Sequence, residues 1–140
     1  MCTRLLYRTL GYTEPTILVV DDHPGTCGLI QRVLTRQGYG VVTVGDGEAA
    51  LATVVTERPS LVIVDVLLPG LDGVTVLTRL RQHNPRLPLI AMSAGNSVPD
   101  LEGIPFLAKP FGLSTLLQLV EGTVAGSLPG PGFGTPPSSL

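Results

Sequence analysis

The chain has 140 residues and a formal net charge of −2, with 44% hydrophobic and 14% charged residues. This length suits one domain of ordinary size, and the hydrophobic content excludes a charge-rich disordered chain. No apolar run approaches the roughly 20 residues that cross a bilayer, so we expect no membrane span. The chain has nine basic residues and a pI near 5.5, so we do not expect the basic surface of a nucleic-acid-binding protein.

Both ends of the chain differ in composition from its middle. Residues 1–15 carry scattered charges and no continuous apolar run, so we expect an N-terminal extension rather than a secretory signal. Residues 126–140 hold four Gly, four Pro and three Ser, which predicts a flexible tail. One folded domain is therefore predicted for residues 16–125. Cys2 and Cys27 are too few for a disulfide framework, which favours a reduced, cytoplasmic protein.

Short apolar runs alternate with helical patterns through this domain. The apolar runs predict strands at 17–20, 41–44, 61–64, 87–92 and 104–107. Helices are predicted from Pro24 to Gly38, after the capping residue Asp46, at 73–83 and at 113–124. The helix after Asp46 is expected to present an apolar face of Ala50, Leu51, Val54 and Val55.

Strands that alternate with helices predict a parallel sheet with helices on both faces. In such sheets ligands bind beyond the carboxyl ends of the strands. The polar residues that follow the strands are Asp21, Asp22, Asp65, Ser93 and Lys109, which is the only lysine of the chain. We therefore expect these five side chains to converge on one edge of the sheet.

These five side chains combine carboxylates, a hydroxyl and an ammonium group, a set that suits phosphoryl transfer to a carboxylate. Three close carboxylates repel one another unless a cation lies between them, and Mg²⁺ prefers carboxylate and carbonyl oxygens. Asp21, Asp22 and Asp65 are thus a plausible magnesium site. Lys109 offers a positive charge, and Ser93 a hydroxyl, to the oxygens of a phosphoryl group. Taken alone, an Asp pair after a strand is as often only a helix cap.

Four segments of the chain resemble the response-regulator receiver domain, the phosphoacceptor module of bacterial two-component signalling. They are ILVVDDHP (17–24), LVIVDVLLPGLDG (61–73), LIAMSAG (89–95) and FLAKPF (106–111). The resemblance implies a doubly wound, flavodoxin-like α/β fold with five parallel strands in the order 2-1-3-4-5.

The resemblance also implies a role for each matching residue. Asp65 would be phosphorylated, and Asp21, Asp22, Asp65 and the backbone carbonyl of Leu67 would hold Mg²⁺. Ser93 and Lys109 would contact the phosphoryl group, Phe106 would be the aromatic residue of the switch, and the peptide bond before Pro110 would be cis. In this interpretation Ser93 moves toward the phosphate and Phe106 fills the space that it leaves. The alternative for Phe106 is a plain core aromatic residue.

The chain departs from the family pattern between the fourth and fifth strands. Ser93 and Lys109 are 16 positions apart, fewer than in typical members, and Pro99 and Pro105 interrupt the segment between them. We expect the fourth helix of the family to be lost here or reduced to a loop. Because Leu67 cannot position a hydrolytic water, we also expect slow self-dephosphorylation.

The resulting hypothesis is a stand-alone phosphoacceptor, not an enzyme. It would take its phosphoryl group from a histidine kinase or histidine phosphotransfer protein, and it would act on an unidentified protein target because no output segment follows Val124. Two alternatives stay open. An aspartyl-phosphate phosphatase is disfavoured, because Leu67 stands where such enzymes carry a second aspartate. A degenerate receiver could act as a binding module without phosphorylation.

Overall fold

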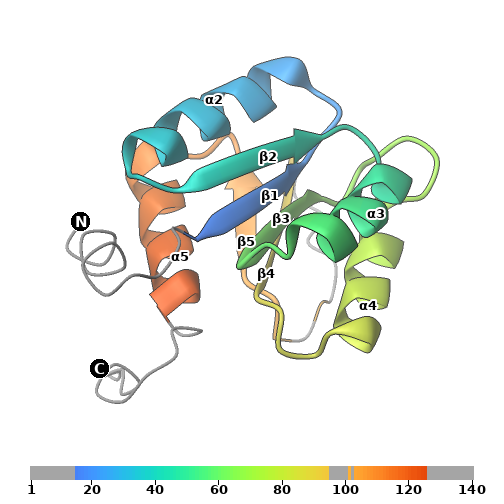
Figure 1. Cartoon of the computed structure of the whole chain (residues 1–140). Helices are drawn as coiled ribbons and strands as arrows, with labels where there is room; N and C mark the ends of the chain where they lie inside the picture. The colour runs from blue at the N-terminus through green and yellow to red at the C-terminus, as the bar shows by residue number, and fades with distance from the viewer. Residues whose placement is uncertain (1–14, 95–100, 102, 126–140) are drawn as a thin grey trace, which may run out of the picture.

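The computed structural model describes residues 15–94, 101 and 103–125 and contains a sheet of five parallel strands (Figure 1). The strands are β1 (Thr16–Val20), β2 (Gly40–Val44), β3 (Leu61–Asp65), β4 (Leu89–Ala94) and β5 (Phe106–Lys109). Their order is β2-β1-β3-β4-β5, which confirms the predicted topology. The order in which strands are added to the sheet therefore changes direction between β1 and β3. In doubly wound folds, ligands bind at this point.

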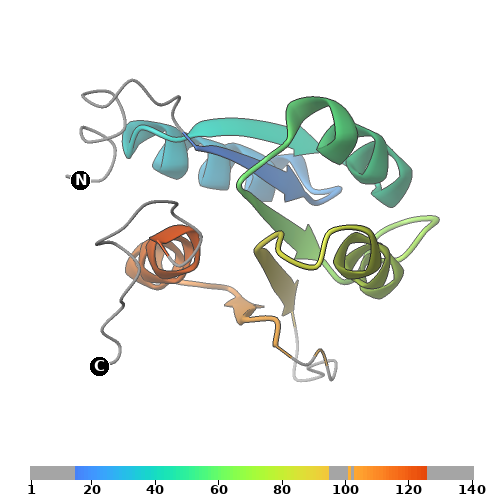
Figure 2. The same ribbon diagram turned by 60° about the horizontal axis from the view of Figure 1, so that its bottom comes forward.

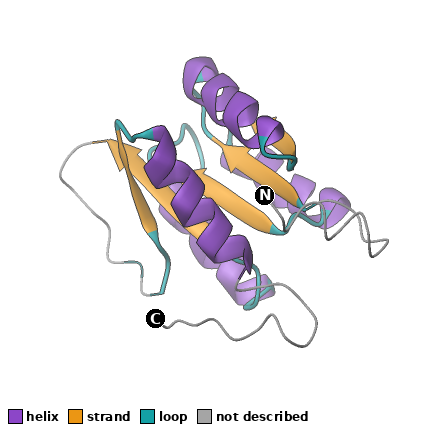
Figure 3. Cartoon of the chain, turned by 90° about the vertical axis from the view of Figure 1, so that its left-hand side faces the viewer, coloured by secondary structure: helices purple, strands orange, loops and turns teal. Residues whose placement is uncertain are grey.

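Four helices of the described residues cover the two faces of the sheet. They are α2 (Pro24–Arg36), α3 (Gly47–Glu57), α4 (Gly73–His83) and α5 (Leu113–Ala125). Figure 2 shows α2 and α5 on one side of the strands and α3 and α4 on the other. Figure 3, viewed from the side of α5, shows that helix lying along its face of the sheet.

The core consists of one apolar layer on each face of the sheet. Ile17 and Val19 of β1 pack with α2 and α5, whereas Leu18 and Val20 pack with α3 and α4. Residues of β3 alternate in the same way, and every residue of that strand is buried. Burial on both faces explains the continuous apolar runs in the sequence. Each fully buried aliphatic side chain contributes roughly 1.5–3 kcal/mol to the stability of the fold.

Two strands start later than their sequence patterns predict. β4 and β5 begin at Leu89 and Phe106, each directly after a proline. Proline has no backbone N–H to donate to a neighbouring strand. The carbonyls of Pro88 and Pro105 still accept hydrogen bonds, from the N–H groups of Val62 (3.1 Å) and Ala91 (2.9 Å). These prolines therefore mark where each strand enters the sheet.

The predicted apolar face of α3 is wrong at one position. Ala50 is buried and Leu51 and Val54 are half-buried, but Val55 is 73% exposed. Only a stripe of a helix that packs on a flat sheet is covered, and Val55 lies beyond that stripe.

Several predictions fall largely outside the described residues. The segment between β4 and β5, where we expect a helix to be lost, is described only at Leu101 and 103–105, and these residues form a turn and irregular backbone. The helix labelled α4 is the one predicted at 73–83, between β3 and β4. The extension (1–15) is described only at Pro15, and the tail (126–140) is not described. None of the described helices is long and apolar enough to cross a membrane.

The cap of α3 gives a first testable prediction. Asp46 Oδ1 accepts a hydrogen bond from the backbone N–H of Ala49 at 2.8 Å. Asp46→Ala is expected to lower the free energy of unfolding by about 1 kcal/mol in urea denaturation, because the N–H loses its acceptor. Asp46→Asn keeps a capping oxygen and should stay within a few tenths of a kcal/mol of wild type. Equal losses in both variants would contradict this role of the cap.

Candidate functional site

The carboxyl ends of β1, β3 and β5 bring three charged side chains together. Val20 pairs with Val64 in the sheet, so Asp21, directly after β1, and Asp65, the last residue of β3, are neighbours. Lys109 is the last residue of β5 and reaches across the end of β4 to both carboxylates. The predicted convergence of Asp21, Asp65 and Lys109 is thus observed.

Lys109 bridges the two buried carboxylates. Its Nζ donates hydrogen bonds to Asp21 Oδ2 and to Asp65 Oδ2, each at 2.7 Å. The side chains of Asp21, Asp65 and Lys109 are 0%, 4% and 15% exposed. Two buried carboxylates that bind the same ammonium group lie close enough to repel each other strongly, and the positive charge of Lys109 offsets that repulsion.

Backbone N–H groups bind the second oxygen of each carboxylate. Asp65 Oδ1 accepts from the N–H of Leu67, and Asp21 Oδ1 accepts from the N–H of His23, both at 2.9 Å. Each buried carboxylate is therefore held at both oxygens, which fixes its orientation.

The pKa values of two groups reflect this arrangement. Burial opposes the charge on Asp21, but the hydrogen bonds from Lys109 and His23 outweigh it, and the pKa of Asp21 falls below its ordinary 3.8. Burial also opposes the charge on Lys109, but its hydrogen bonds to Asp21 and Asp65 raise its pKa above the ordinary 10.5. Because its pKa is lower in the folded state, the charged Asp21 stabilises the fold above about pH 3.8, and this stabilisation is lost as the pH falls through the folded-state pKa. Because its pKa is higher in the folded state, the charged Lys109 stabilises the fold below about pH 10.5, and this stabilisation is lost as the pH rises through the folded-state pKa.

Acid denaturation tests the contribution of Asp21. We expect the free energy of unfolding in EDTA, measured with urea, to fall as the pH is lowered from about 7 to about 3. Asp21→Asn should flatten part of this fall, because its side chain does not titrate. A wild-type slope in Asp21→Asn would show that Asp21 does not cause the acid loss.

Two further side chains complete the cluster. Asp22 is exposed, and His23 Nδ1 lies 3.1 Å from Asp21 Oδ1 and 3.3 Å from Asp22 Oδ1. Asp21, Asp22, His23 and Asp65 offer ligand atoms that all lie within 4.8 Å of one another. Oxygen donors of this kind fit a hard divalent cation, and the 40% exposed side chain of Asp22 is accessible to it. The residues present therefore fit Mg²⁺.

Ser93 and Phe106 lie on the neighbouring strands β4 and β5. Ser93 is buried, and its hydroxyl donates to the carbonyl of Ala94 at 3.0 Å. Phe106 is partly buried and packs against the apolar layer under α3 and α4. The Lys109–Pro110 peptide bond is cis, the isomer that the resemblance implies. The switching roles of Ser93 and Phe106 stay predictions.

Sequence reasoning missed two residues of this edge. His23 belongs to the cluster, and its position directly after the Asp pair was the available signal. Gly73 is the other: a Cβ atom there would lie 2.0 Å from the carbonyl oxygen of Asp65. The N–H of Gly73 also donates to the carbonyl of Val66 at 3.1 Å. The start of α4 is thus packed directly onto the backbone that carries Asp65.

Comparison with known proteins agrees with this geometry. The family model of the response regulator receiver domain matches residues 17–121. The chain belongs to this receiver family. The receiver domain of NtrX from Brucella abortus has a similar structure, with a TM-score of 0.70 and 30% identity over 77% of this chain and 97% of that one.

Several curated relatives of this receiver domain are named as transcriptional regulatory proteins. The alkaline phosphatase synthesis transcriptional regulatory protein PhoP from Bacillus subtilis is 41% identical over 68% of this chain and 42% of its own length. The transcriptional regulatory protein PrrA from Mycobacterium tuberculosis is 37% identical over 79% of this chain and 50% of its own. The chain thus spans about half the length of the curated relatives that it matches.

Proposed function

We propose that this receiver domain accepts a phosphoryl group on Asp65 from a histidine kinase or a histidine phosphotransfer protein, with Mg²⁺ as cofactor. One observation carries the proposal: the Asp65 carboxylate is held by Lys109 beside the buried Asp21, with the exposed Asp22 next to them. The family of the chain supports it further, since receiver domains are typically phosphoacceptors.

The reaction would be a direct transfer between two nucleophiles. A carboxylate oxygen of Asp65 forms a bond to phosphorus while the P–N bond of the donor phosphohistidine breaks, and the electron pair of that bond stays on the imidazole nitrogen. Bound Mg²⁺ would supply positive charge to the phosphoryl oxygens, with Asp21, Asp22, Asp65 and the carbonyl of Leu67 as its expected ligands. Lys109 would transfer one hydrogen bond from the Asp65 carboxylate to a phosphoryl oxygen.

The phosphoryl group would act as a switch by its charge. It adds about 1.5 to 2 negative charges at an edge whose buried groups already balance one another. The hydroxyl of Ser93, which bonds only to a neighbouring carbonyl among the described residues, would turn toward the phosphate. Phe106, partly buried one strand away, would then repack, and a protein target would recognise the changed surface.

A hollow beside Lys109 is the expected docking place of the donor. Its volume is about 370 Å³, and Leu29, Pro110 and Phe111 are among its walls. Leu29 of α2 is 37% exposed, which leaves apolar surface next to the acceptor edge. An amphipathic helix that carries the donor histidine would cover this hollow and bring the histidine to Asp65.

Phosphorylation by a small donor tests the proposal. After incubation with acetyl phosphate and Mg²⁺, intact-mass measurement should find one phosphoryl adduct on the wild type and none on Asp65→Asn. Asp46→Asn, the same change at the exposed helix cap, should be labelled like the wild type. A wild type without an adduct, or an undiminished adduct in Asp65→Asn, would refute Asp65 as the acceptor.

A further inference from the structure

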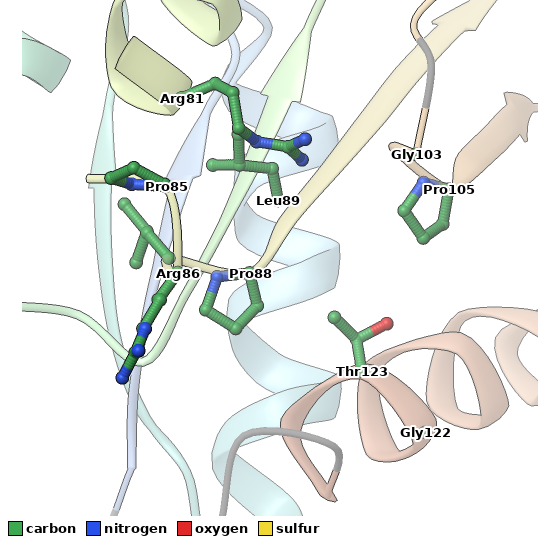
Figure 4. A pocket seen from close by; sticks show the side chains of 10 residues that line it. Arg81, Pro85, Arg86, Pro88, Leu89, Gly103, Pro105, Gly122 and Thr123 are labelled. Carbon is green, nitrogen blue, oxygen red and sulfur yellow. The ribbon is translucent and has the colours of Figure 1, made fainter. Parts of the chain in front are cut away.

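A second pocket lies at the opposite end of the sheet from the acidic cluster, where β4 begins (Figure 4). Its volume is about 670 Å³. The end of α4, the segment 85–89, Gly103 with Pro105, and the last turns of α5 at Gly122 and Thr123 form its walls. None of these residues belongs to the proposed phosphorylation site.

The charge of this pocket is unbalanced. Among the residues that the structure describes, Arg81 and Arg86 line it and no aspartate or glutamate does. The ion pairs of the described residues involve only His23 and Lys109 as cations, so neither arginine has a carboxylate partner among them. Figure 4 shows that the guanidinium group of Arg86 points away from that of Arg81, so Arg81 is the cation that would attract an anion here.

Arg81 is the group with the strongest need of a ligand. Its Nε is buried and has no hydrogen-bond partner among the described residues. Figure 4 shows its guanidinium group directed over Leu89 toward the side of Gly103. A Cβ atom on Gly103 would lie 3.6 Å from Nη1 of Arg81, so this turn passes close to the guanidinium group. A buried donor without an acceptor is unfavourable, and an anion in the pocket would provide the acceptor.

Apolar side chains also contribute to the walls of the pocket. Pro85, Pro88 and Pro105 present their rings around the pocket, together with Leu87 and Leu89. Such a surface favours a ligand that has an apolar body in addition to its charge. Gly122 opens the pocket on the side of α5, because a Cβ atom there would meet nothing within 4 Å.

We propose that this pocket binds a small organic anion, a carboxylate or phosphoryl-type group on an apolar body. Arg81 binds the anionic group and the prolines contact the apolar body. The site is independent of the phosphorylation of Asp65, because it lies at the other end of the strands and shares no residue with the acidic cluster.

A titration followed by ¹H–¹⁵N correlation spectra tests the proposal. The probe is phenylphosphonate in EDTA; its phosphorus is bonded to carbon, so it cannot phosphorylate Asp65. We expect saturable shifts of the amide signals of Leu87, Gly103 and Gly122, with those of Asp21 and Asp65 unchanged. Methylphosphonate, which lacks the large apolar body, should bind more weakly. Absent shifts at the pocket would overturn the proposal, and equal binding of the two probes would overturn the role of the apolar walls.

Three variants separate the pocket from general charge effects. Arg81→Gln should weaken phenylphosphonate binding by about tenfold or more. Arg79→Gln removes the same charge from an exposed position of α4 that does not line the pocket, and it should bind like the wild type. Gly122→Leu adds a side chain at a pocket wall where a Cβ atom would meet nothing within 4 Å, so it should block binding while the protein stays folded. Equal weakening by Arg79→Gln and Arg81→Gln, or full binding by Gly122→Leu, would contradict the assignment.

Discussion

Replacing Lys109 with methionine is expected to lower the free energy of unfolding by about 3 kcal/mol at neutral pH without Mg²⁺. The substitution leaves Asp21 and Asp65, 0% and 4% exposed, facing each other without the ammonium group that binds both. Removal of one partner from a buried ion pair is costly because it leaves an uncompensated buried charge. We also expect no detectable phosphoryl adduct with acetyl phosphate, since Lys109 is the cation that would bind the transferred group.

Urea denaturation with and without Mg²⁺ measures this effect. Because the same carboxylates fit a divalent cation, Mg²⁺ should raise the free energy of unfolding of Lys109→Met by more than that of the wild type. Lys109→Arg keeps the positive charge in a different shape and should lose less stability than Lys109→Met. Equal losses in the two variants would show that the charge of Lys109 is not what stabilises the cluster. An unchanged adduct in Lys109→Met would remove Lys109 from the proposed mechanism.

Gly73→Ala is expected to be the most damaging single-methyl change among the described glycines. The added Cβ would lie 2.0 Å from the carbonyl oxygen of Asp65 and 2.5 Å from the Cα of Val66. Both contacts are with backbone, which cannot turn away as a side chain can, so α4 and the end of β3 must separate. We expect a loss of about 3 kcal/mol or more in the free energy of unfolding. Phosphorylation should also slow, because the displaced strand end carries Asp65.

Gly122→Ala is the matched control for this prediction. Gly122 lies inside α5, where a Cβ atom would meet nothing within 4 Å, so the change should stabilise the helix by about 0.5–1 kcal/mol. Urea denaturation of both variants, with intact-mass measurement of the phosphoryl adduct, gives the comparison. If Gly73→Ala were as stable as the wild type, the close packing of α4 on β3 would be wrong.

Much of the fold could be predicted from the sequence because burial on both faces leaves a direct pattern. The apolar runs of β1 and β3 locate the centre of the sheet, and the polar residues Asp21 and Asp65 come directly after them. Parallel strands end at the same edge, so chain order alone brings these residues together. The same argument found Lys109 at the end of β5.

What the sequence pattern could not predict depends on contacts between distant segments. The exposure of Val55 depends on how α3 rests on the sheet, which helical periodicity alone does not fix. The need for glycine at position 73 comes from the close approach of α4 to the backbone of Asp65. The strands β4 and β5 start at Leu89 and Phe106 because the proline before each has no N–H to donate, although its carbonyl still accepts a hydrogen bond.

The bridge made by Lys109 has a consequence for chemical labelling. Lys109 is the only lysine of the chain, its side chain is 15% exposed, and its raised pKa keeps the amine protonated. Only a deprotonated amine reacts with acylating reagents, so the folded protein should react slowly at this side chain. The rate of acylation at Lys109, measured on the peptide that contains it so that the N-terminal amine does not contribute, therefore reports how often the acidic edge opens.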